Sequence, residues 1–170
     1  MRTRFLIDRA VPALLSLCAS LAVWAADSPL IGHEAPDFAL RATAGDNVRL
    51  SEARGQVVVL SFYGSRCNTC RSHLAALDSL YRTYAPAGLA IYGVSIDDDT
   101  EAARRFAASL GVGFPMLADP AKAVGRAYAV DRLPTLVIVD REGKVRYVHR
   151  DPGSRGEPPY VGELRRLLDE

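Results

Sequence analysis

The fold of this chain is decided by Val57-Val58-Val59-Leu60-Ser61-Phe62-Tyr63, followed by Gly64-Ser65-Arg66-Cys67-Asn68-Thr69-Cys70. The first seven residues are mostly β-branched, apolar or aromatic, which predicts a buried strand. After Cys70, the apolar residues Leu74, Leu77, Leu80 and Tyr81 recur at helical spacing. The pattern therefore predicts a helix from about Cys67 to Tyr84, with both cysteines where a strand ends and a helix begins.

This placement suits dithiol chemistry. Two cysteines three residues apart in a first helical turn lie within disulfide reach. The N-terminus of a helix carries a partial positive charge and free N–H groups, and both stabilise a thiolate. We therefore expect Cys67, nearest the helix terminus, to be the nucleophile and Cys70 to be the resolving thiol. Arg66 adds positive charge that favours the thiolate.

Residues 1–25 are expected to be a signal peptide or an N-terminal membrane anchor. Arg2, Arg4 and Arg9 form a basic region, an apolar stretch runs from 10 to 23, and Val23-Trp24-Ala25 resembles a cleavage signal. We expect a periplasmic or otherwise extracytoplasmic location, with tethering to the inner membrane if the segment is retained. Residues 26–36 are expected to be a flexible lead-in to one domain over residues 37–170.

The number of cysteines and the charge balance of the domain argue against two kinds of protein, a disulfide-stapled scaffold and a nucleic-acid-binding protein. Because Cys18 falls in the signal segment, the exported domain would keep Cys67 and Cys70 alone. A four-residue ring constrains little chain, so this pair is better explained by chemistry than by stapling. The acidic and basic residues of the domain nearly balance, which gives no reason to expect nucleic acid as a partner.

The rest of the chain alternates strand and helix patterns. We expect a hairpin of 37–40 with 47–50, a strand at 89–96, a helix at 100–110, a strand at 114–117, a short helix at 120–127, strands at 136–139 and 144–148, and a closing helix at 160–168. Alternating βαβ units followed by a hairpin predict an α/β fold with a mixed central sheet flanked by helices.

Three motifs resemble the TlpA/ResA/CcmG-like group of exported thiol–disulfide oxidoreductases, within the redoxin superfamily. They are the opening motif at 31–38, the strand and cysteine loop at 60–70, and Leu133-Pro134-Thr135 with the hairpin after it. The resemblance implies a thioredoxin-like fold with an N-terminal β-hairpin extension and a central insertion. It also implies a redox-active Cys67–Cys70 disulfide, no cofactor and a role in cell redox homeostasis.

The resemblance further implies how partners bind. The proline that matches Pro134 is cis in the family and faces the sulfurs, which exposes the backbone of Leu133 for strand-like pairing with a substrate. We therefore expect Leu133, Pro134 and Thr135 to bind substrate. The implied partners are protein dithiols and disulfides, with apocytochromes and other exported proteins as candidates, and a membrane electron donor or acceptor.

The chain departs from the family at positions that tune the thiols. Arg66 replaces a common tryptophan, His73 replaces a common glutamate, and Ser61 stands where thioredoxins have a buried aspartate. His73 is either a base or proton shuttle for Cys70 or a solvated helix residue. His33 and His149 carry no local motif and are expected at the surface.

Three alternatives remain open at this point. Cys67, Cys70 and His73 form C-x-x-C-x-x-H, which could hold copper or zinc in a metallochaperone, although no fourth ligand is evident and we expect no metal. A peroxiredoxin-like antioxidant enzyme would need Thr or Ser three residues before its cysteine, where this chain has Gly64 and Cys67. A redox-inert binding domain would not need the cysteine pair.

Overall fold

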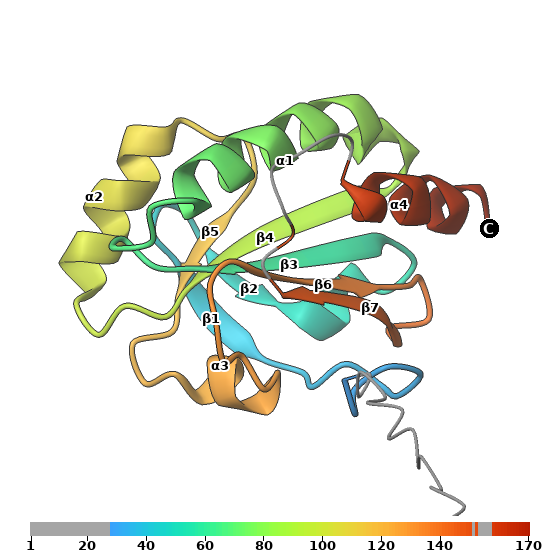
Figure 1. Cartoon of the computed structure of the whole chain (residues 1–170), viewed down its shortest axis with the longest axis horizontal. Helices are drawn as coiled ribbons and strands as arrows, with labels where there is room; N and C mark the ends of the chain where they lie inside the picture. The colour runs from blue at the N-terminus through green and yellow to red at the C-terminus, as the bar shows by residue number, and fades with distance from the viewer. Residues whose placement is uncertain (1–27, 151, 153–157) are drawn as a thin grey trace, which may run out of the picture.

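The computed structural model describes residues 28–150, 152 and 158–170 (Figure 1). The expected signal peptide therefore lies outside the described residues. One seven-stranded sheet has the order β2-β1-β5-β4-β3-β6-β7. The elements are β1 (Ala39–Ala42), β2 (Asn47–Arg49), η1 (Leu50–Ala53), β3 (Val57–Tyr63), α1 (Cys70–Tyr84), η2 (Ala85–Ala87), β4 (Leu89–Ser95), α2 (Thr100–Leu110), β5 (Met116–Ala118), α3 (Ala123–Ala127), β6 (Thr135–Val139), β7 (Val145–Arg150) and α4 (Pro159–Asp169).

The sheet is mixed, which confirms the expected α/β class. β3 pairs in parallel with β4 and antiparallel with β6, while β4 pairs in parallel with β5. Along the chain, α2 and β5 come after β4 and before α3, at the place of the expected central insertion. The N-terminal hairpin of β1 and β2 joins the sheet through β5, because β1 pairs antiparallel with that strand.

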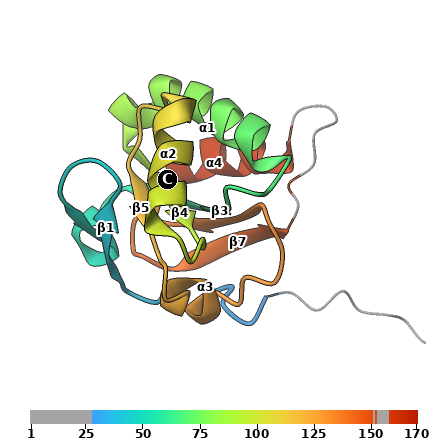
Figure 2. The same cartoon turned by 90° about the vertical axis from the view of Figure 1, so that its left-hand side faces the viewer.

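Helices cover both faces of the sheet (Figures 1 and 2). Val57, Val59 and Tyr63 of β3 share a core with α1, α2 and α4. The alternate residues of β3 share a second core with α3 and the hairpin. Every residue of β3 is buried, as a strand covered on both faces requires, and this explains why six of its seven residues are apolar or aromatic, with Ser61 the exception.

Element boundaries differ from the expectation at the functional helix. α1 begins at Cys70 and not at Cys67. Residues 64–69 form turns instead, in which the Cys67 N–H donates to the Gly64 carbonyl at 3.0 Å and the Cys70 N–H donates to the Cys67 carbonyl at 3.3 Å. Cys67 therefore lies just before the helix, and Cys70 is its first residue.

Residues 28–36, part of the expected lead-in, are hydrogen-bonded to the β6–β7 hairpin. The Gly32 N–H donates to the Val145 carbonyl at 2.8 Å, and the Ala35 N–H donates to the Gly143 carbonyl at 2.9 Å. The Tyr128 hydroxyl also donates to the Pro36 carbonyl at 2.8 Å. The division of the chain into lead-in and domain stays a prediction. Within the described residues, no helix has the length and apolar character needed to cross a membrane.

Candidate redox site

The two cysteines form a disulfide at the carboxyl end of β3. Cys67 and Cys70 are bonded, with their Cα atoms 5.4 Å apart. Cys67 is half-buried, whereas Cys70 has no exposed surface. The Cys67 sulfur also lies 3.7 Å from the hydroxyl oxygen of Thr69. One sulfur thus meets the surface, and the other lies in the core beneath it.

An aspartate that the sequence pattern did not single out holds the cysteine loop. Asp97 accepts the Ser65 N–H at 2.9 Å and the Ser65 hydroxyl at 3.0 Å. The hydroxyl of Ser95 donates to the same carboxylate at 2.9 Å. Asp97 can reach the loop because β3 and β4 are parallel neighbours whose carboxyl ends meet at one edge of the sheet. That rule was the available signal, since Asp97 directly follows the β4 pattern.

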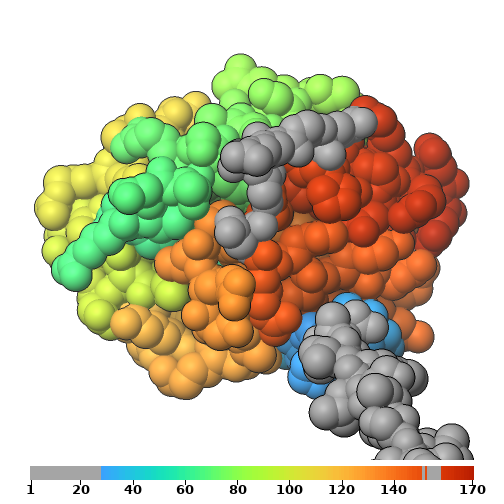
Figure 3. Space-filling model, viewed as in Figure 1, coloured from blue at the N-terminus to red at the C-terminus, as the bar shows by residue number. Residues whose placement is uncertain are grey.

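A cleft of about 750 Å³ opens beside Cys67. It is bounded by the loop of residues 64–69, the connection from β4 to α2, and the segment of 130–133 before β6. Figure 3 shows the surfaces of these three segments next to one another on one face of the molecule. We call this hollow the disulfide cleft. Cys67 lines this cleft and Cys70 does not.

The segment before β6 reaches the cysteine loop closely. The Leu133–Pro134 peptide bond is cis, which confirms that expectation. Leu133 is half-buried in the wall of the disulfide cleft, while Pro134 and Thr135 are buried. A Cβ added to Gly64 would lie 3.1 Å from Leu133 Cδ1, so glycine gives this approach its room. The contact of the Pro134 ring with the sulfurs stays a prediction.

His73 is buried, so its reading as a solvated helix residue is wrong. The side chain is 9% exposed, and its ring meets Tyr160 of α4 edge-on, with centroids 6.0 Å apart. Burial lowers the pKa of His73 to about 4. Its Nε2 atom has no hydrogen-bond partner among the described residues. The imidazole is therefore neutral at physiological pH and stands one helical turn from Cys70.

The other positions of interest divide between core and surface. Ser61 is fully buried, and its hydroxyl has no hydrogen-bond partner among the described residues. Arg66 and His33 are exposed. His149, also expected at the surface, is instead half-buried, because its Nε2 lies 2.6 Å from Glu163 of α4. Sequence spacing could not show this contact between two separate elements.

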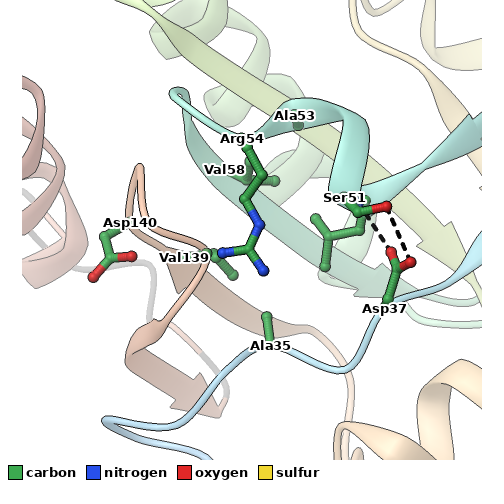
Figure 4. A pocket seen from close by; sticks show the side chains of 10 residues that line it. Ala35, Asp37, Ser51, Ala53, Arg54, Val58, Val139 and Asp140 are labelled. Atoms are coloured by element: carbon green, nitrogen blue, oxygen red, sulfur yellow. Dashed lines mark hydrogen bonds between the residues drawn. The ribbon is translucent and has the colours of Figure 1, made fainter.

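A second, smaller pocket lies at the other end of the sheet (Figure 4). Ala35, Val58 and Val139 line it, and the Arg54 side chain extends across it. Ser51 and Asp37 are hydrogen-bonded at its edge, at 3.0 Å between the hydroxyl and the carboxylate. This pocket contains neither cysteine, so the disulfide cleft is the candidate redox site.

The fold, together with a C-x-x-C disulfide where β3 ends and α1 begins, defines the class of protein. The chain is a thiol–disulfide oxidoreductase of the thioredoxin fold. It belongs to the AhpC/TSA family, whose model matches residues 31–148.

Two proteins of similar sequence are named for the same activity. The thiol–disulfide oxidoreductase ResA of Geobacillus kaustophilus is 34% identical over 118 residues, which are 69% of this chain and 68% of the relative. ResA of Bacillus subtilis is 34% identical over 114 residues, which are 67% of this chain and 64% of the relative.

Solved structures agree with the fold. A crystal structure from Chlorobium tepidum, described as a thiol:disulfide interchange protein DsbE, has a TM-score of 0.68 and 32% identity, covering 80% of this chain and 92% of its own. A solution structure from Bacteroides thetaiotaomicron, described as a protein disulfide isomerase, has a TM-score of 0.75 and 31% identity. The match covers 82% of this chain and 91% of that one.

Proposed function

We propose that this chain is an exported enzyme that exchanges disulfides with protein partners through a mixed disulfide at Cys67. The carrying observation is the unequal exposure of the two sulfurs, since Cys67 borders the disulfide cleft and Cys70 is fully buried. A protein partner can approach the first sulfur only. The roles of nucleophile and resolving thiol follow from this difference.

The exchange conserves atoms and electrons. In the reduced enzyme the Cys67 thiolate attacks one sulfur of a partner disulfide, which forms the mixed disulfide and releases the other partner sulfur as a thiolate. Cys70 then loses its proton and attacks Cys67, so that the Cys67–Cys70 disulfide forms and the partner leaves with both thiols reduced. Two electrons have passed to the partner. The same steps in reverse oxidise a dithiol.

Neighbouring residues assist these steps in the proposal. Leu133, Pro134 and Thr135 bind an extended partner, and Leu133 in the cleft wall supports this role. The Thr135 hydroxyl donates to the Arg132 carbonyl at 2.8 Å, which braces the segment from inside. His73 tunes Cys70 as a neutral imidazole one helical turn away, because its buried Nε2 has no other hydrogen-bond partner among the described residues. Arg66 tunes Cys67 through its positive charge.

The partners are drawn from the compartment to which the chain is exported. Residues 1–25, with their basic and apolar regions, support export and leave open a tether to the inner membrane. Exported proteins, apocytochromes among them, are the candidate substrates. A membrane electron donor or acceptor would reset the disulfide, because each turnover leaves the enzyme in the opposite redox state.

Trapping variants test the proposal. In a Cys18→Ser background, reduced Cys70→Ser should accumulate disulfide-linked complexes with partners that carry a disulfide, such as oxidised insulin or oxidised exported proteins, because no second thiol resolves them. Cys67→Ser should trap nothing and should lose exchange activity. Non-reducing electrophoresis with mass spectrometry reads both outcomes. Trapping by Cys67→Ser alone would reverse the roles, and full activity in both variants would refute the proposal.

The reduction potential of the reduced–oxidised couple then sets the direction of electron flow. A value near about −270 mV, that of thioredoxin, indicates a reductant, and one near about −120 mV, that of DsbA, indicates an oxidant. Equilibration with glutathione of defined ratio measures it directly.

A further inference from the structure

The charged side chains in and around the disulfide cleft differ in whether they have a partner of opposite charge. Most of them are held by a partner of opposite charge. Lys122 pairs with Asp98 at 2.9 Å, Arg150 pairs with Asp131 at 3.2 Å, Arg132 lies 3.9 Å from Asp131, and Arg105 lies 3.9 Å from Asp99. Asp97 is occupied by the Ser65 and Ser95 hydrogen bonds described above.

Arg66 is the exception among these residues. It is exposed, lines the cleft, and makes no ion pair or hydrogen bond within the part of the chain that the structure describes. It also immediately precedes Cys67 in the sequence. Among the cationic side chains that line the cleft, Arg66, Lys122 and Arg132, it is thus Arg66 that has no carboxylate partner among the described residues, and it stands next to the sulfur that meets the protein partner.

The chemistry of this charge indicates what it recognises. A guanidinium is planar and always charged, and its paired N–H groups match the two oxygens of a carboxylate. A partner chain bound by its reactive cysteine would bring the residues beside that cysteine near Arg66. We infer that Arg66 selects protein partners that carry Asp or Glu directly beside the cysteine to be attacked.

This inference rests on the proposed function, since it concerns which partners react at Cys67. It does not depend on how strongly Arg66 activates the thiolate. Activation changes the rate with every partner alike, whereas recognition changes the ratio of rates between partners. A ratio is therefore the quantity to measure.

The experiment uses the full chain with Cys18→Ser, reduced, and three disulfide-linked peptide dimers that differ in one residue only. The residue beside the cysteine is Glu, Gln or Lys. We expect the Glu peptide to react about 1.4-fold to five-fold faster than the Gln peptide at low salt, the range of an exposed ion pair, with the Lys peptide slowest. The preference should shrink in 0.5 M salt, because exposed charges are screened there.

Two variants assign the effect. Arg66→Gln should bring the Glu-to-Gln ratio close to one, and Arg66→Glu should favour the Lys peptide. Arg132→Gln is the matched control, because Arg132 lines the same cleft but lies beside Asp131, and it should keep the preference. Loss of the preference in Arg132→Gln, or equal rates for all peptides with Arg66 in place, would overturn the inference. No reaction with any peptide would instead count against the proposed function.

Discussion

Replacement of His73 by Leu should remove a pH dependence from the stability of the oxidised protein. The imidazole is buried against Tyr160 and burial lowers its pKa to about 4, from 6.5 in an unfolded chain. Between these two pH values the unfolded chain binds a proton that the native protein does not. The free energy of unfolding should therefore fall as the pH is lowered from 6.5 to 4. The difference in pKa corresponds to a loss of about 3 kcal/mol.

Urea unfolding of the oxidised protein at several pH values measures this slope. Asp37 and Asp78 also have pKa values below their usual 3.8, but their contributions are lost mainly below that pH. The range from pH 4.5 to 6.5 therefore isolates histidine. Leu has no proton to bind, so His73→Leu should be nearly flat there, while His33→Gln, at an exposed position, should retain the slope. A slope in His73→Leu as steep as that of the unaltered protein would refute the reasoning.

Two other predictions concern close contacts in the sheet and its loops. Asp97→Asn should lower the free energy of unfolding by about 1–3 kcal/mol, because an amide cannot accept every hydrogen bond that the carboxylate accepts. Asp99→Asn should change it little, since Asn caps a helix about as well as Asp, and equal losses in the two variants under urea unfolding would contradict this account. Gly93→Ala should cost about 1–3 kcal/mol, because its Cβ would clash with Met116 Sδ. Met116→Val should relieve part of that cost in a double-mutant cycle, and strictly additive losses would argue against the clash.

The strand and the cysteine pair were predictable because their signals are local. The largely apolar run of β3, without alternation of polar residues, shows that both of its faces are covered, and the helical spacing of Leu74 and Leu77 begins only after the second cysteine. This spacing carries no information on the residues before Leu74, so the predicted start at Cys67 is too early. Cys67 is kept out of α1 by turns whose loop is fixed by Asp97, which lies 32 positions beyond Ser65.

The histidines show the limit of local patterns more clearly. His73 could be placed on the helix, but its burial depends on Tyr160 of α4, which no spacing within α1 reveals. His149 likewise is removed from the surface by Glu163, which belongs to a different element. The sequence identified the dithiol, while the environment of each titrating side chain depended on which helix packs over which strand.

The hydrogen bonds of residues 32–35 to residues 143–145, at the start of β7, fix where the N-terminal segment joins the domain. They lie at the amino end of β3, whereas the disulfide lies at its carboxyl end, and a strand of seven residues separates the two by about 20 Å. The polypeptide before residue 32 thus joins the domain at the pole opposite the sulfurs. An anchor, tag or surface linkage attached on that side would point the dithiol outward, so immobilisation through the N-terminus should leave Cys67 facing its partners.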